Sequence, residues 1–304
     1  MIHGNTTVLF EGKPVGTPDA GTFWRIMAEH KVKSFFTAPT ALRAIKREDP
    51  DGKLVRNYDL SNLKALYLAG ERADPDTIEW AQRQLNVPVV DHWWQTETGY
   101  TIVGNPLGIE HLPVKLGSPT VPMPGYEVHI LDNDGSRKAV GELGAIAIRL
   151  PLPPGTLPTL WNAEKRYIDS YLKTFKGYYE TGDAGLIDED GYVHILGRDK
   201  DLIISGGYNI YPKELEEIID DQVGVLESAV IGVPHPDFGE TPIAVIVSET
   251  ETAPDLEIIE SNLSKSLARY KHPRKLLWID QLPRNTMGKV QKNILREEYK
   301  SLFL

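Results

Sequence analysis

Hydrophobic residues recur at helical spacing in some segments of the chain and form short apolar runs in others, which together predict the elements of residues 19–92. Helical spacing is found in FWRIMAEHKV (23–32), TALRAIKRE (40–48) and DTIEWAQRQL (76–85). Short apolar runs typical of buried strands are KSFFTAP (33–39), LKALYLAG (63–70) and VPVVDHW (87–93). Asp74 and Pro75 suit the cap and first turn of the third helix. This alternation predicts a parallel sheet with crossover helices.

A different pattern runs from Gly117 to about Leu196. Short apolar segments are separated by turn residues, as in YEVHILDNDG (126–135), GELGAIAIRL (141–150) and GLIDEDGYVHILG (185–197). These segments predict a small antiparallel barrel or a curled sheet.

A third pattern follows the charged turn at Arg198. A helix is predicted at PKELEEIID (212–220), and strands at VLESAVIGVPH (225–235), TPIAVIVSE (241–249) and KLLWIDQLP (275–283). Leu256, Ile259, Leu263 and Leu267 share one helical face, and QKNILREEYKSL (291–302) forms the last helix. We therefore expect three parts: a parallel α/β subdomain at 1–116, a β-barrel-like subdomain at 117–197, and a C-terminal α+β domain at 198–304.

Composition and charge narrow the class of partner. The 304 residues are 41% hydrophobic and 25% charged, with a formal net charge of -10 and no long Lys/Arg run. These values argue against a nucleic-acid or membrane-surface partner and favour a small molecule. The start of the chain lacks the features of a secretion signal, and no apolar run is long enough to span a bilayer, so we expect a cytoplasmic protein.

The chain contains no cysteine. This excludes disulfides, a thiolate nucleophile and cysteine-based zinc sites. Any thioester chemistry therefore takes its thiol from a cosubstrate. P-loop, GxSxG and HExxH motifs are also missing from the sequence.

The segment DHWWQTETG, residues 91–99, directly follows the third predicted strand. Thr96 and Thr98 offer hydroxyl groups, Glu97 offers a hard oxygen ligand for magnesium, and Trp93 and Trp94 offer walls for a small pocket. An equally weighted alternative is a strand end with a capping threonine and two core tryptophans.

Two further loops carry candidate polar groups. Asp183 of YETGD is a candidate acceptor of hydrogen bonds from two ribose hydroxyls, and DEDG at 188–191 is typical of a hairpin turn. From the residues alone, a turn is the favoured interpretation of both segments. In GRDKDLIISGG, Arg198 is a candidate nucleotide ligand and Lys200 a candidate pivot, although a solvated charged turn is the ordinary interpretation.

Glycines mark two further candidate sites, at residues 206–207 and 288–289. Gly206 and Gly207 either let the backbone approach a ligand closely or form a bulge. Lys289 follows Gly288, so its ammonium group is a candidate point charge for a phosphate site, with an exposed surface lysine as the alternative.

Five motifs occur in a fixed order along the chain: LAGE, WWQTETG, YYETGD, GRDKDLIISGG and PRNTMGK. In this respect the sequence resembles the adenylate-forming superfamily of acyl-CoA synthetases, peptide-synthetase adenylation domains and luciferases. Residues 1–195 resemble propionyl- and acetyl-CoA synthetases, whereas residues 197–304 resemble malonyl-CoA-type synthetases. The resemblance implies the C-terminal portion of the adenylate-forming fold, that is, α/β with a β-barrel-like subdomain plus a small C-terminal α+β domain.

The resemblance also implies a role for each matching residue. Lys289, Thr96 and Glu97 would be catalytic, with Lys289 bridging the substrate carboxylate and the α-phosphate and Glu97 binding magnesium. The implied nucleotide-binding residues are Gly70, Glu71, Arg72, Asp91, His92, Trp93, Gln95, Thr96, Asp183 and Arg198. Trp94 would close the acyl pocket, Gly206 and Gly207 would line the CoA tunnel, and Lys200 would be the hinge.

The implied activity is the AMP-forming ligation of a short-chain carboxylate to CoA, with ATP, Mg2+ and CoA as cofactor or cosubstrates. We expect propionate to be favoured over acetate and butyrate because the Trp94 indole leaves little room. Family members carry a Gly/Ser/Thr-rich phosphate loop upstream of these motifs. The alternative is therefore a truncated, catalytically impaired nucleotide-binding or interaction module that lacks an N-terminal half. A peptide-synthetase adenylation domain is disfavoured, since Trp94 leaves little space for an amino-acid side chain.

Overall fold

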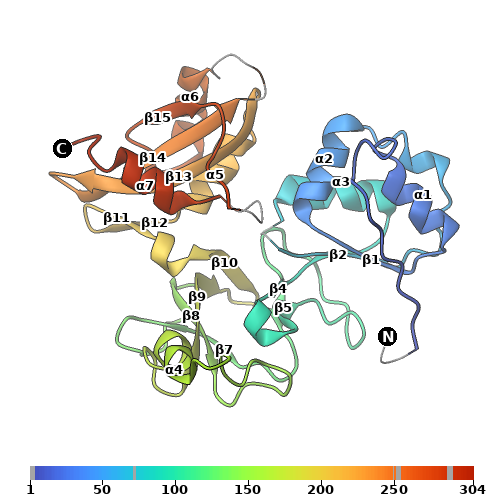
Figure 1. Cartoon of the computed structure of the whole chain (residues 1–304), viewed down its shortest axis with the longest axis horizontal. Helices are drawn as coiled ribbons and strands as arrows, with labels where there is room; N and C mark the ends of the chain where they lie inside the picture. Colours follow the sequence, from blue (N-terminus) through green and yellow to red (C-terminus); the bar gives the residue numbers. More distant parts are fainter. Residues whose placement is uncertain (1–3, 71–72, 249, 251–254, 286–289) are drawn as a thin grey trace. The chain divides into compact units, whose positions relative to one another are not determined.

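The structure is a computed structural model that describes residues 4–70, 73–248, 250, 255–285 and 290–304 (Figure 1). The chain divides into two compact units. The first comprises Met1–Thr181 and Leu186–Ile195, and the second comprises Gly182–Gly185 and Leu196–Leu304. Each unit has its own apolar core.

The first unit begins with a parallel sheet of three strands in the order β1-β2-β3. These strands are β1 (Ser34–Thr37), β2 (Ala65–Leu68) and β3 (Val89–Asp91). The helices that alternate with them are α1 (Thr22–Glu29), α2 (Pro39–Glu48) and α3 (Pro75–Leu85). The predicted alternation of helices and strands is thus confirmed. Asp74 caps α3, since its carboxylate accepts a 2.8 Å hydrogen bond from the backbone N–H of Thr77.

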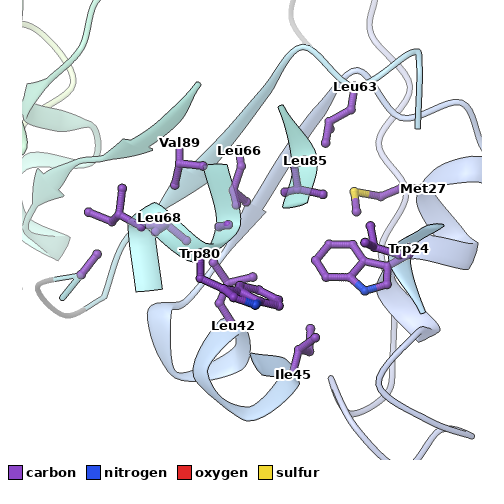
Figure 2. Packing of buried hydrophobic residues seen from close by; sticks show 14 of the residues in the cluster. Trp24, Met27, Leu42, Ile45, Leu63, Leu66, Leu68, Trp80, Leu85 and Val89 are labelled. Carbon is purple, nitrogen blue, oxygen red and sulfur yellow. The ribbon is translucent and has the colours of Figure 1, made fainter. Parts of the chain in front are cut away.

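Helices α1, α2 and α3 pack against one face of this sheet (Figure 2). Trp24, Leu42 and Trp80 come from the three helices, and Leu66 and Leu68 come from β2. Successive strand residues point to opposite faces, so the helices cover the face that carries these two leucines. Burying one such large side chain contributes about 1.5–3 kcal/mol, which makes this cluster the main stabilising element of the sheet.

Two antiparallel sheets follow along the chain, and residues 182–185 and 196–198 of the second sheet are counted with the second unit. One has the order β4-β5-β6, with β4 (Trp93–Trp94), β5 (Thr101–Gly104) and β6 (Val121–Pro122). The other has the order β10-β9-β8-β7, with β7 (Val128–Leu131), β8 (Gly144–Arg149), β9 (Tyr178–Ile187) and β10 (Val193–Arg198). Helix α4 (Glu164–Tyr171) lies between β8 and β9 in the chain. Of the two predicted alternatives, the open sheet is the one observed, because neither sheet closes on itself within the described residues.

The second unit is built on one five-stranded sheet in the order β12-β11-β14-β13, with β15 paired to β14 in parallel. Its strands are β11 (Ile203–Ser205), β12 (Tyr208–Ile210), β13 (Val225–His235), β14 (Gly239–Ser248) and β15 (Leu276–Ile279). Its helices are α5 (Pro212–Asp220), α6 (Leu256–Ser266) and α7 (Lys292–Tyr299).

Both faces of this sheet are buried, which explains the nearly continuous apolar runs of β13 and β14. Val230 and Ile246 contact the cluster that contains Leu215 of α5 and Leu263 of α6. Ile231 and Val245, one position away, belong to the opposite cluster with Leu295 of α7. The predicted α+β unit is confirmed.

Three predicted helix ends were wrong. Helix α1 ends at Glu29 rather than Val32, because Lys31 takes a positive φ of 50° that a right-handed helix does not allow. Helix α6 ends at Ser266, and Leu267 follows it with extended backbone while its side chain still packs against the same cluster. Helix α7 ends at Tyr299 rather than Leu302, because residues 300–303 form turns. No helix in the described part of the chain combines the length and apolarity needed to cross a membrane.

Candidate functional site

The candidate residues of the first unit lie where the parallel sheet ends. Asp91 is the last residue of β3 and is 7% exposed. Its Oδ2 accepts a 3.3 Å hydrogen bond from the backbone N–H of Ala73, in the segment that leads from β2 to α3. Asp91 therefore holds the backbone at Ala73, directly before the cap of α3. Gly70 is exposed.

His92 follows β3 and is enclosed by aromatic rings. Its imidazole makes edge contacts with Phe36 at 5.5 Å and Tyr67 at 6.0 Å between ring centroids. The Nδ1 atom is buried and has no hydrogen-bond partner among the described residues. Burial lowers the pKa of His92, so the ring is neutral near neutral pH.

Trp93 and Trp94 form β4 and pair with β5. The indole of Trp93 packs against the cluster that contains Ile102 and Ile146, as expected of a core tryptophan. Trp94 points the other way and is 41% exposed. Trp93 is thus a core tryptophan, as in the structural alternative, whereas Trp94 is not buried, and its role as a pocket wall stays a prediction.

The next residues form a rigid turn. Thr96–Thr98 is one turn of 3-10 helix, and the hydroxyl of Thr98 donates to the Gln95 carbonyl at 2.9 Å while accepting from the Gln95 N–H at 3.2 Å. Thr98 is 2% exposed and is therefore a capping residue, which confirms the structural alternative for this threonine. Thr96 is exposed at the start of the turn.

Gln95 joins this turn to strand β9. Its Nε2 donates a 2.7 Å hydrogen bond to the carbonyl of Thr181, and its Oε1 accepts one of 3.1 Å from the hydroxyl of Tyr179. Gln95 is 8% exposed. The side chain expected to contact nucleotide therefore has a structural role that ties the turn to the antiparallel sheet.

Glu97 is half-buried in the middle of the turn. Its Oε1 accepts a 2.8 Å hydrogen bond from the hydroxyl of Tyr171, and its backbone carbonyl accepts one of 2.7 Å from Leu157. Oε2 has no hydrogen-bond or ion-pair partner within the described residues. One carboxylate oxygen is thus held in place and the other is available for a cation.

Asp183 and Arg198, in the second unit, are brought together although 15 residues separate them. Nε of Arg198 lies 3.3 Å from Oδ1 of Asp183, and the Asp183 side chain is 8% exposed against 43% for Arg198. The neighbouring DEDG segment forms the turn between β9 and β10, as predicted: the backbone N–H groups of Asp190 and Tyr192 donate to Asp188.

Gly206 and Gly207 form a two-residue hairpin turn between β11 and β12, in which Ser205 pairs with Tyr208. Their φ angles are +57° and +87°, which suit this turn type. The predicted bulge is therefore wrong at this position. Lys200 is exposed in the short 3-10 helix Asp199–Asp201 that follows β10.

Three candidates, Glu71, Arg72 and Lys289, lie outside the described residues. The segment before Lys289 is bounded by an antiparallel bridge between Arg284 and Val290. The backbone N–H of Gln291 also donates to the Pro283 carbonyl at 2.8 Å. The described residues on either side of residues 286–289 are therefore held together by these backbone contacts.

The first unit contains oxygen atoms that could bind Mg2+. Glu97 offers a carboxylate oxygen and Thr96 an exposed hydroxyl one residue away. Within the described part of the chain no three His, Cys, Asp or Glu side chains form a cluster that would enclose an ion. This donor set fits Mg2+, which is usually bound by one or two carboxylates together with substrate phosphates and water.

Sequence reasoning missed Tyr171 and Tyr179, which contact the turn through hydrogen bonds. Their rings are stacked in parallel at 5.3 Å between centroids. The two tyrosines are 74 and 84 positions away from their partners Glu97 and Gln95. Periodicity carries no information at this separation. The only signal in the sequence is a group of tyrosines that leads into the YETGD motif, of which Tyr179 is the first residue.

Comparison with known proteins gives two family matches. The AMP-binding enzyme family matches residues 1–156, and the AMP-binding enzyme C-terminal domain matches residues 214–289. Mouse acyl-CoA synthetase short-chain family member 3, mitochondrial, is 40% identical over 97% of this chain and 44% of its own length. Propionate–CoA ligase of Escherichia coli is 36% identical over 97% of this chain and 48% of its own length.

Solved structures agree with these matches. The crystal structure of ATP-bound MatB from Rhodopseudomonas palustris has a TM-score of 0.78 and 34% identity, over 94% of this chain and 54% of that one. The chain spans about half the length of the curated relatives it matches.

Proposed function

The chain belongs to the AMP-binding enzyme family, as its five ordered motifs indicated, and on this premise we propose that it contributes to the AMP-forming ligation of a short-chain carboxylate to CoA. The observation that carries the proposal is the turn at Thr96 and Glu97. Its ends are fixed by Gln95 and Thr98, while the Thr96 hydroxyl and Oε2 of Glu97 remain available. Such a preorganised pair suits the phosphates of a nucleotide and their cation.

The proposed reaction has two steps. A carboxylate oxygen attacks the α-phosphorus of ATP and the bond to pyrophosphate breaks, giving an acyl-adenylate. The sulfur of CoA then attacks the acyl carbon, AMP leaves, and the thiol proton is released. Because the chain has no cysteine, the thiol belongs to the cosubstrate. Bound Mg2+ would neutralise charge on the phosphates.

We assign the chain's own residues to these steps as follows. Thr96 contacts the phosphates and Glu97 holds the cation. Asp183 accepts from the ribose hydroxyls, with Arg198 beside it. Lys289 compensates the charge that develops on the α-phosphate. Removing one preorganised charge of this kind typically lowers the rate by about two to three orders of magnitude.

Trp94 supports a short acyl chain as substrate. Its indole is 41% exposed, next to the Gln95–Thr98 turn, so it is free to form one wall of a small pocket. The E. coli relative is named a propionate–CoA ligase and the mouse relative belongs to a short-chain family, which supports propionate as the favoured acid.

A second candidate function is nucleotide binding or protein interaction without turnover. Phe36 favours it, because this ring is 59% exposed on the sheet face opposite the helices. Parallel sheets are normally covered on both faces. A partner that covers this face of the sheet would therefore make an apolar contact with Phe36.

The test is pyrophosphate release from Mg-ATP by the 304-residue chain, with acetate, propionate, butyrate or malonate, with and without CoA. Release that is fastest with propionate and lost in Lys289→Ala supports the ligase. Release without acid preference contradicts the short-chain assignment. AMP binding with no release from any acid supports the second candidate instead.

A further inference from the structure

The hydroxyl of Tyr171 is hydrogen-bonded to the carboxylate of Glu97 across 74 positions of sequence. Tyr171 is the last residue of α4, a helix whose only fully buried side chain in the described structure is Tyr167. The donor–acceptor distance is 2.8 Å, a normal value for a hydroxyl donor. The contact joins a helix with no catalytic candidate to the residue expected to hold the metal.

The position of the Tyr171 ring is fixed from both sides. Its plane is parallel to that of Tyr179 within 5°, at 5.3 Å between centroids, and Tyr167 lies 5.6 Å away on the same helix. Tyr179 is 1% exposed and donates to Oε1 of Gln95. The two stacked tyrosines thus hold residues 95 and 97 of the same turn through their hydroxyls.

The backbone of the turn is held by a separate route. The N–H of Leu157 donates to the Glu97 carbonyl at 2.7 Å, and the hydroxyl of Tyr167 donates to the Leu157 carbonyl at 3.1 Å. The backbone at Glu97 therefore stays supported when the Tyr171 hydroxyl is removed. The part that the hydroxyl alone determines is the orientation of the carboxylate.

We propose that Tyr171 is a positioning residue for Glu97, an inference that rests on the proposed function of the turn. By occupying Oε1 it selects one rotation of the carboxylate and presents Oε2 to the cation of the metal–nucleotide complex. Partners that orient a metal ligand typically change metal affinity or activity by about 10- to 100-fold when removed. Tyr171 acts through Glu97 and does not itself contact the metal or the nucleotide.

The test compares Tyr171→Phe with Tyr167→Phe. Both substitutions keep the ring and its stacking and remove one hydroxyl from the same helix, but only the first hydroxyl contacts the carboxylate. The readouts are ATP affinity by calorimetry as a function of Mg2+ concentration, the same titration with Mn2+, and thermal unfolding of each variant.

We expect Tyr171→Phe to raise the Mg2+ concentration needed for half-maximal ATP affinity by about 10-fold, whereas Tyr167→Phe, whose hydroxyl contacts Leu157 and not the carboxylate, changes it much less. An equal Mg2+ requirement in both variants and the wild type would overturn the inference, even if Tyr171→Phe unfolds at lower temperature. A wild-type chain that binds no Mg-ATP, or a Glu97→Gln variant with unchanged Mg2+ dependence, would instead overturn the proposed function of the turn together with the inference.

Discussion

The guanidinium group of Arg198 lies against the carboxylate of Asp183, with Nε 3.3 Å from Oδ1 and Nη1 3.5 Å from Oδ2. The two residues come from the adjacent strands β9 and β10. Asp183 is nearly buried, and the guanidinium group of Arg198 compensates part of its charge. The pair therefore stabilises the hairpin and at the same time fixes the carboxylate assigned to the ribose.

Replacing Arg198 should cost stability because it removes a cation that lies against a nearly buried carboxylate. We expect Arg198→Met, which keeps most of the apolar stem, to lower the free energy of unfolding by about 1–3 kcal/mol, as measured by urea titration. Arg198→Lys is the control, since it restores the charge but not the forked geometry, and should recover part of the loss. Identical stability of Arg198→Met and the wild type would contradict the role of the pair.

Asp188 should make the first unit sensitive to acid. Burial alone raises the pKa of this carboxyl group, but hydrogen bonds from Lys115, His194 and the backbone of Tyr192 and Asp190 outweigh it and hold the pKa well below its ordinary value. A carboxylate with a lowered folded-state pKa stabilises the protein above the unfolded-state pKa of about 4. This contribution is lost as the pH falls below that value.

Asp188→Asn should therefore be less stable than the wild type by about 1 kcal/mol near pH 7, because the pair with Lys115 is partly exposed. The difference in unfolding free energy between Asp188→Asn and the wild type should shrink at about pH 3. At this pH the ionised carboxylate of Asp188 contributes less to the stability of the wild type. Asp190→Asn is the matched control, since Asp190 is 69% exposed and contacts the same lysine. A stability difference that does not change with pH would count against this assignment.

The elements that sequence could predict are those fixed by local patterns. The segment at 212–220 became helix α5 with its predicted bounds, and 225–235 became β13, since in each the apolar spacing matches one or two buried faces. Asp74 was identified as a cap from its place before Pro75. These features depend on neighbours a few residues away.

The site was predicted less completely because its geometry depends on distant residues. The motif WWQTETG identified the turn, but it could not distinguish the capping role of Thr98 from the exposed position of Thr96. Likewise, nothing near Glu97 in the sequence points to Tyr171 as its donor. Such contacts are set by how α4 and β9 pack around the turn, which no local pattern encodes.

Substitutions at Gly207 can test separately its role in the hairpin turn and its proposed contact with CoA. At its φ of +87° a branched side chain is strained, although a Cβ would meet no atom within 4 Å. We expect Gly207→Val to lose about 1–2 kcal/mol of unfolding free energy, and Gly207→Asn to lose less, because asparagine tolerates left-handed backbone.

The Gly207→Asn variant is then informative about function. If the backbone at this turn lines the CoA path, the added side chain should leave acid-dependent pyrophosphate release intact and reduce thioester formation. Assaying both products from one reaction mixture separates the two steps. Unchanged thioester formation in a variant with near wild-type unfolding would exclude the proposed CoA contact at Gly207.

Phe35 and Phe36 are adjacent in β1 but face opposite sides of the sheet, which makes them a matched pair. Phe35 packs against the helix cluster and contacts Phe23 at 5.3 Å between centroids, whereas Phe36 is 59% exposed. Phe35→Ser should therefore destabilise the first unit by about 2–4 kcal/mol in urea unfolding, while Phe36→Ser should stay within about 0.5 kcal/mol of the wild type. Binding of an apolar fluorescent dye to the folded chain should fall only in Phe36→Ser, because this ring is the accessible one. Equal destabilisation by the two substitutions would show that the Phe36 face is covered in the folded chain, and would remove the observation that favours an interaction module.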